Sequence, residues 1–156
     1  MDTSKRIPLQ PVPAGFSPDV EAVARRLYAE LWNQQRYDVA EEILDPEFTS
    51  NAAPGLRGSA AKLGAIRSYH QAFPDLTHTV EDVVGGPDRL AVRLTISGTD
   101  TGGFKGRPAT GRALRTWVVD FLTFSDGRII REWVGVDWLG ALLQLGVVPD
   151  PWAAPG

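Results

Sequence analysis

The chain has the order of elements expected of an α+β fold. Three segments with the spacing of amphipathic helices come first, and four segments typical of β-strands follow from residue 76 onward. Helices and strands segregated in this way favour an antiparallel sheet that helices cover on one side. Asp126 and Gly127 separate the last two strand segments, and an Asp-Gly pair in that position strongly predicts a β-hairpin.

The first predicted helix spans residues 17–35. Ser17 is a favoured N-cap residue, and Pro18 suits the first position inside a helix. The apolar residues of the segment recur at steps of three and four, which gives one buried stripe. We therefore expect an amphipathic helix that packs against the sheet.

Two shorter helices are predicted next. The first spans residues 37–44 and should end at Asp45, because the residue before a proline is disfavoured in the α region. A short extended segment, residues 47–51, follows it. Ser59 is the predicted N-cap of the third helix, which Pro74 should end.

The apolar pattern then changes to the alternation expected of strands. The four predicted strands are residues 76–86, 89–102, 113–124 and 128–137. The glycine-rich connection at residues 99–112 is too long for a tight hairpin, and loops of this kind often carry function. A short helix should follow the last strand and end near Gly146.

The composition is that of one globular domain. Of 156 residues, 43% are hydrophobic and 22% are charged, and the net charge of −3 gives no basis for a nucleic-acid partner. The chain has no cysteine, which excludes disulfides, thiolate nucleophiles and soft-metal sites. We expect an N-terminal arm at residues 1–16, a folded domain at 17–146 and a tail at 147–156. No signal peptide or membrane span is predicted, so a cytoplasmic protein is expected.

The register of the hairpin predicts which side chains share a face. With a two-residue loop, Asp120 should face Trp133 and Thr116 should face Asp137, so both carboxylates should point to one side. The opposite side is also apolar and needs a cover. Its residues are Trp117, Val119, Phe121, Ile130, Val134 and Val136. A second copy of the chain is the simplest cover, so we expect a homodimer that buries at least about 1,200 Å².

Several short strings have an order and spacing found together in one family. They are FPDL at Phe73, VEDVV at Val80, GTDTGGFKG at Gly98, PATGR at Pro108, SDGRIIREWVGVD at Ser125 and LLQLG at Leu142. Over residues 20–146 the chain thereby resembles the SnoaL-like polyketide cyclases and ester cyclases, a branch of the nuclear transport factor 2-like superfamily. The resemblance implies a cone-shaped α+β barrel, in which a curved antiparallel sheet wraps around about three helices and leaves a pocket at one end.

The same resemblance implies an activity. The aldol cyclases of this family close the last ring of an anthracycline-like methyl ester without a cofactor, and their proposed acid/base is an Asp after the Glu-Trp strand, which matches Asp137. Asp100 and Asn51 stand where many relatives have His. Epoxide hydrolases, hydroxylase subunits and isomerases share the superfamily, and fold analogy does not choose among them.

Asp137 and Asp120 are the candidate catalytic residues. Asp137 lies between Trp133 and Trp138. These apolar neighbours should raise the pKa of the Asp137 carboxyl group toward the range useful for proton transfer. The alternative is that Asp137 caps the helix that follows. Asp120 should join it in the same cleft, where two carboxylates can divide acid and base roles. The alternative for Asp120 is an ion pair with Arg131 or Arg93.

The remaining candidates are substrate-binding residues of a pocket for a small hydrophobic or polyketide-like molecule. They are Asn51, His78, Trp133, Tyr28, Arg93 and Val118. His70 is predicted to be a core residue, and its spacing from His78 matches no metal signature. The run GRPATGR at Gly106 imitates a phosphate-binding loop but lacks its Lys-Ser/Thr ending. We therefore expect neither a metal nor another cofactor.

Three functions follow from these candidates. The leading hypothesis is a cofactor-free cyclase in which Asp137 removes a proton next to a carbonyl and Asp120 assists. The second is epoxide opening, with Asp120 activating water and a protonated Asp137 donating to the epoxide oxygen. The third is a ligand-binding module without catalysis, in which Asp137 is only a helix cap.

Overall fold

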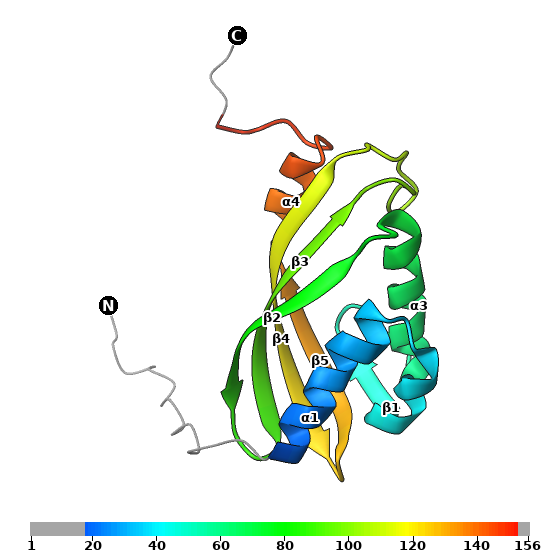
Figure 1. Cartoon of the computed structure of the whole chain (residues 1–156), viewed down its shortest axis with the longest axis vertical. Coiled ribbons are helices and arrows are strands. Elements are labelled where there is room, and N and C mark those ends of the chain that lie inside the picture. Colours follow the sequence, from blue (N-terminus) through cyan, green and yellow to red (C-terminus); the bar gives the residue numbers. More distant parts are fainter. Residues whose placement is uncertain (1–17, 153–156) are drawn as a thin grey trace, which may run out of the picture.

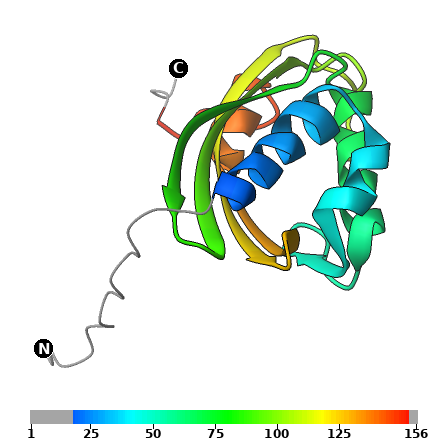
Figure 2. The ribbon, with the colours of Figure 1, turned by 60° about the horizontal axis from the view of Figure 1, so that its bottom comes forward.

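A strongly curved sheet wraps around the first helix, and a long third helix closes the other side (Figures 1 and 2). This computed structural model describes residues 18–152, so the predicted N-cap at Ser17 and the arm at 1–16 lie outside the described residues. Helices packed against one concave sheet confirm the predicted α+β barrel. No helix within the described range is long and apolar enough to cross a membrane.

The helices lie close to their predicted positions. Helix α1 (Pro18–Arg26) continues into the π-helical segment η1 (Leu27–Asn33), and together they form the first predicted helix. The second helix consists of the short turn η2 (Tyr37–Val39) and α2 (Ala40–Ile43). Helix α3 spans Gly58–Ala72 and α4 spans Trp138–Gln144. The π-helical geometry of η1 was not predicted; such segments often occur at functional sites.

Five strands form one sheet in the order β1-β5-β4-β3-β2. Strands β2 (Thr77–Gly85), β3 (Arg89–Thr99), β4 (Ala113–Ser125) and β5 (Arg128–Val136) form the predicted antiparallel meander. Strand β1 (Leu44–Ser50) pairs in parallel with β5 and starts three residues before the predicted extended segment. It includes Asp45-Pro46 because an edge strand tolerates a proline.

The predicted register of the β4–β5 hairpin is correct only at the turn. Phe124 pairs with Ile129 as predicted, but Thr123 pairs with Arg131, so the register shifts by one residue. Such a bulge moves every later side chain of the strand to the opposite face. The predicted pairs Asp120–Trp133 and Thr116–Asp137 are therefore wrong.

Beyond the bulge, Asp120 faces Val134 and Leu122 faces Glu132. Glu132 lies on the concave side, where it is 2% exposed, while Trp133 is 52% exposed on the convex side. The bulge thus exchanges the tryptophan expected in the pocket for a second carboxylate.

The concave face of the sheet and the helices share one apolar core. The fully buried members from the sheet include Phe48, Leu90, Leu94, Leu122 and Ile129, and those from the helices and the turn after α3 include Leu27, Leu31, Ile43, Ile66 and Phe73.

Candidate active site

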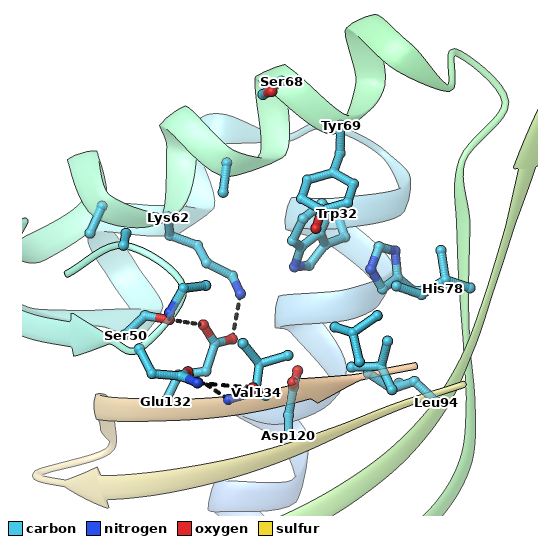
Figure 3. A pocket seen from close by; sticks show the side chains of 18 of the residues that line it. Trp32, Ser50, Lys62, Ser68, Tyr69, His78, Leu94, Asp120, Glu132 and Val134 are labelled. Atoms are coloured by element: carbon cyan, nitrogen blue, oxygen red, sulfur yellow. Dashed lines mark hydrogen bonds and ion pairs between the residues drawn. The ribbon is translucent and has the colours of Figure 1, made fainter. Parts of the chain in front are cut away.

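A cavity of about 380 Å³ lies between α3 and the concave face of the sheet (Figure 3). Its wall is mostly apolar and includes Leu94, Val118, Val134 and several alanines. A small number of polar side chains converge on it from different elements: Ser50, Lys62, His78, Asp120 and Glu132. An apolar pocket with a few converging polar groups is typical of a site for a small organic molecule.

Asp120 points from β4 into this cavity (Figure 3). The side-chain oxygen Oδ2 accepts a hydrogen bond from the hydroxyl of Tyr28 at 2.8 Å, while Oδ1 has no hydrogen-bond partner within the described chain. Burial, and then the charge of Glu132, raise the pKa of Asp120 to about 7, although Lys62 and the Tyr28 hydrogen bond act in the opposite direction. A carboxyl group with such a pKa can take up and release a proton near neutral pH.

Glu132 is held in a different way. The Lys62 ammonium reaches down from α3 and forms an ion pair with Oε1, and the Ser50 hydroxyl donates to Oε2 at 2.7 Å (Figure 3). Both charged side chains are almost fully buried. A buried ion pair needs further hydrogen bonds to offset desolvation, and Ser50 supplies one. The Lys62 nitrogen also lies 5.1 Å from the centre of the Trp32 ring.

His78 lines the cavity as a neutral imidazole. Burial, followed by the charges of Lys62 and His70, lowers its pKa to about 3. The ring packs on Trp32 with centroids 4.4 Å apart, and its Nδ1 atom has no partner within the described residues. The side-chain amide of Asn33 holds the strand here, accepting from the His78 N–H and donating to its carbonyl. His78 can therefore offer one neutral ring nitrogen to a ligand.

Asn51 lies at the cavity rim but acts mainly on the backbone. Its amide donates to the carbonyl of Val134 at 2.9 Å and accepts from the N–H of Val134 at 2.8 Å. These bonds extend the β1–β5 pairing by one position beyond Ser50. Asn51 therefore fixes the strand that carries Glu132.

Asp137 lies outside the cavity wall. Its N–H points to the carbonyl of Trp117, and its Oδ1 accepts from the N–H of Gly140 at 2.8 Å, which makes it the N-cap of α4. The predicted pairing of Asp120 with Asp137 in one cleft does not form, because of the bulge. The epoxide-opening mechanism, which needs that pair, loses its structural basis.

The other predicted residues divide into two groups. Val118, Asn51 and His78 line the cavity, and Tyr28 reaches it through its bond to Asp120. Trp133 and Arg93 lie on the convex side of the sheet and contribute nothing to the wall, which is a correction. The predicted ion pair of Asp120 with Arg93 or Arg131 is also absent among the described residues.

Sequence reasoning missed Lys62, Glu132 and Ser50. Lys62 carried a signal, because helical spacing puts it on one stripe with Ile66, four residues later, and His70, eight residues later. A lysine in that stripe indicates a buried cation that needs an acidic partner. Glu132 carried no such signal, because its direction depends on the bulge.

The glycine-rich connection between β3 and β4 is held in a defined shape by Asp100. This residue is 2% exposed, and its carboxylate accepts from the N–H groups of Gly103 and Thr110 and from the Thr110 hydroxyl. The N–H groups of Thr101 and Gly102 donate to the carbonyl of Ala72 at the end of α3. Asp100 is thus a structural residue of the loop.

No group of three His, Cys, Asp or Glu side chains within residues 18–152 is arranged to hold a metal ion. The polar groups that face the cavity include two carboxylates, a lysine, a serine and a neutral histidine. Their arrangement supports proton transfer and the stabilisation of a negatively charged oxygen.

The fold and this cavity define an α+β barrel protein with a pocket of the kind that holds a small organic molecule. Residues 22–145 match the family of SnoaL-like polyketide cyclases, and the chain belongs to that family. It is similar to the aklanonic acid methyl ester cyclase DauD of Streptomyces sp. (strain C5), with 30% identity over 90% of this chain and 87% of that protein. The aklanonic acid methyl ester cyclase DnrD of Streptomyces peucetius is also 30% identical, over 90% of this chain and 97% of that protein.

A solved structure has the same fold. TsrD from Streptomyces laurentii superimposes with a TM-score of 0.77 and 28% identity, covering 83% of this chain and 96% of that chain. The predicted resemblance to SnoaL-like cyclases and the prediction of an enzyme are therefore confirmed.

Proposed function

We propose that the protein closes a ring in a polyketide by an intramolecular aldol reaction, without a cofactor, and that Asp120 is its acid/base. The observation that supports this most directly is the state of the Asp120 carboxyl group. Its Oδ1 atom is buried at the cavity wall without a hydrogen-bond partner among the described residues, and the pKa of the group is about 7. A group of this kind can remove a proton next to a carbonyl.

The proposed reaction is an isomerisation in which the enzyme neither gains nor loses a proton overall. Ionised Asp120 takes the proton from a carbon next to a carbonyl, and the electrons of that C–H bond form an enolate. The enolate carbon then bonds to a second carbonyl carbon of the same molecule, and the electron pair of that C=O bond moves to its oxygen. This alkoxide takes back the proton from Asp120, so that the product is an isomer of the substrate.

Lys62 would stabilise the enolate oxygen. Its ammonium has three N–H donors, of which one pairs with Glu132, and the side chain faces the cavity. Donors fixed in a water-poor site stabilise developing negative charge more strongly than water does. Glu132 would keep the ammonium in place through their ion pair.

Asp137 is the competing assignment for the acid/base. Its Oδ1 caps α4 through Gly140, and the residue is not part of the cavity wall, so a substrate held in the cavity would not meet it. Asp120 lines the cavity, and its Oδ1 has no hydrogen-bond partner within the described residues.

The test compares Asp120→Asn with Asp137→Asn, which keeps an oxygen for the cap. Aklanonic acid methyl ester is the first substrate to assay, with DnrD as the positive control. We expect Asp120→Asn to lower kcat roughly 10²- to 10⁴-fold while the circular dichroism spectrum is kept, and Asp137→Asn to stay within about threefold of wild type. The reverse pattern would assign the chemistry to Asp137. In wild type, kcat/KM should rise with pH and level off above about 7.

We also propose that the enzyme is a homodimer joined through the convex face of the sheet. Trp117, Phe121 and Trp133 are each about half exposed on that face. Large apolar side chains gathered on one exposed surface are typical of a contact between proteins.

A further inference from the structure

One histidine of the cavity wall has hydrogen-bonding groups that the protein itself does not use. His78 extends from β2 into the cavity and is 7% exposed (Figure 3). Its Nδ1 atom is buried without a hydrogen-bond partner, and its Nε2 atom has none within residues 18–152 either. A neutral imidazole carries a proton on one ring nitrogen and a lone pair on the other. In either tautomer, His78 therefore presents a donor and an acceptor that no group of the described chain satisfies.

Packing alone does not account for an imidazole at this position. The ring lies against Trp32, with centroids 4.4 Å apart, and stacks on Tyr28 at 6.3 Å with an interplanar angle of 24°. A phenyl ring also packs well against aromatic side chains, and it carries no polar atom. A buried donor without an acceptor destabilises the folded state. The imidazole is therefore explained better by a bound molecule that supplies the missing partner.

The other histidine of the chain provides a contrast. The Nε2 atom of His70 lies 2.8 Å from the carbonyl oxygen of Trp32. A carbonyl oxygen only accepts, so Nε2 carries the proton of His70, and the Nδ1 lone pair is the atom left without a partner. His70 is not part of the cavity wall. The N–H donor of the core histidine thus has an acceptor inside the protein, whereas that of His78 has none.

Three polar side chains meet around the space that His78 faces. Asp120 points into it from β4, Lys62 reaches it from α3, and His78 lies across the space from Lys62 (Figure 3). Tyr28 links two of them, because its hydroxyl donates to Oδ2 of Asp120 at 2.8 Å and its ring stacks on His78. The imidazole is thereby held in a fixed position relative to the carboxyl group. An aldol reaction involves one C–H group and two carbonyl groups, and this cavity offers one base and two separate donors.

We infer that His78 is a catalytic hydrogen-bond donor to the carbonyl group that is attacked during ring closure, while Lys62 binds the enolate oxygen. The inference rests on the proposed function and deepens it, because it assigns the second carbonyl of the substrate to a residue. The acceptor is a neutral carbonyl oxygen, so the substrate needs no charge.

His78 transfers no proton in this step. Its N–H binds the carbonyl oxygen, which becomes negative as the C–C bond forms, and Asp120 then protonates the alkoxide. Burial, which is the largest cause, lowers the pKa of His78 to about 3, so the ring stays neutral. A neutral imidazole can polarise a carbonyl group in this way.

The test replaces the ring and then restores one donor at a time. His78→Phe keeps a flat ring against Trp32 and Tyr28 but has no donor, His78→Gln places an amide nitrogen near the position of Nε2, and His78→Asn places one near that of Nδ1. With aklanonic acid methyl ester, His78→Phe should lower kcat about 10²- to 10³-fold and change KM less than about fivefold, because the donor acts mainly in the transition state. One of the two amide variants should recover at least about tenfold of the lost kcat. A kcat of His78→Phe within about threefold of wild type, or equal losses in all three variants, would overturn the inference.

The pH profile separates a direct role of His78 from an effect on Asp120. In His78→Phe, kcat/KM should still level off above about 7, because the carboxyl group keeps its surroundings. A shifted profile would mean that the ring acts through Asp120, and would overturn the assignment. Ser68→Ala is the matched control, since it removes a hydroxyl of the cavity wall that lies far from Asp120 (Figure 3), and its kcat should stay within about twofold of wild type.

NMR of the ring nitrogens tests the contact itself. The chain has two histidines, so ¹⁵N-labelled histidine reports on both of them. In Asp120→Asn, binding of the ester should shift the ring signals of His78 and leave those of His70 nearly unchanged. Unchanged His78 signals with bound ester would overturn the inference even if the aldol chemistry of Asp120 holds. A wild type that neither binds nor converts the ester would instead overturn the proposed function, and the inference with it.

Discussion

Asp120 and Glu132 are two buried carboxylates in one cavity with different surroundings. Glu132 takes the ammonium of Lys62 and the hydroxyl of Ser50, while Asp120 has only the hydroxyl of Tyr28. The negative charge of Glu132 adds to the desolvation that raises the pKa of Asp120. Two carboxyl groups held in such different surroundings can divide the roles of acid and charge stabiliser.

The raised pKa of Asp120 predicts a pH-dependent stability. The folded carboxyl has a pKa of about 7 and the ordinary value is 3.8, so between these pH values the folded state holds a proton that the unfolded state has lost. The stability that this proton contributes is complete below the unfolded pKa and is lost as the pH rises through 7.

Asp120→Asn should therefore gain stability relative to wild type as the pH rises from 4 to 8, by an amount on the order of a few kcal/mol. Urea unfolding of both proteins across this range measures the difference, and groups other than Asp120 largely cancel in it. A difference that grows toward acid pH would contradict the raised pKa.

The ion pair of Lys62 and Glu132 predicts strong coupling between two residues. Lys62→Met leaves the Glu132 carboxylate buried without its cation, and should lower the free energy of unfolding by roughly 3–5 kcal/mol. Lys62→Met/Glu132→Gln should recover most of this loss, because no unpaired charge remains. Urea denaturation of the single and double variants measures the cycle; a double variant as unstable as Lys62→Met would mean that packing of the lysine stem, not the ion pair, sets the stability.

At the scale of an element, the end of β5 depends on the cap that Asp137 provides to α4. Asp137→Ala removes the acceptor for the Gly140 N–H and should cost about 1 kcal/mol of stability, whereas Asp137→Ser should cost less because serine also caps helices. Thermal unfolding of the two variants tests this. Equal losses in both would show that Asp137 stabilises the fold by a contact other than the cap.

The elements themselves were largely predictable from the sequence. The helical spacing, the change to alternation and the Asp-Gly turn locate α1, α3, β4 and β5 within a few residues, because local spacing reflects which face is buried. The bulge in β5 was not predictable. Ile129 and Ile130 are both apolar, so the sequence fits either register, and only packing of the whole sheet selects the observed one.

This single shift also explains how far the site could be predicted. The extra residue of the bulge lies on β5, so the alternation along β4 is unchanged and Asp120 was placed correctly in the cavity. Trp133 and Asp137 lie on the shifted part of β5, and their predicted facing failed together with that of Glu132. Tyr28 and His78 come from separate elements, so their approach to Asp120 depends on tertiary packing that spacing alone does not encode.

At the scale of the molecule, the two faces of the curved sheet differ in what covers them. The concave face is covered by helices and encloses the cavity. On the convex face, Phe121 and Trp133 are cross-strand partners whose rings meet edge to face at 5.8 Å, and Trp117 lies further along β4. Each of the three is more than 50% exposed. Within the described residues no helix covers them, which leaves a second copy of the chain as the proposed cover.

The homodimer predicts a molar mass of twice the 17.0 kDa chain in light scattering at micromolar concentration. Phe121→Arg/Trp133→Arg places two charges in the proposed contact and should give a monomer, because burying unpaired charges against a second copy is costly. Leu56→Arg is the matched control: Leu56 is 54% exposed on the loop before α3, away from the convex face, and its substitution should leave the dimer intact. If wild type has the mass of one chain, or if the double variant stays dimeric, the convex face is not the contact.

The cavity opens on the other side of the sheet, so loss of the dimer should leave the acid/base chemistry of Asp120 in place. The kcat of the monomeric variant therefore separates the effect of assembly from that of catalysis.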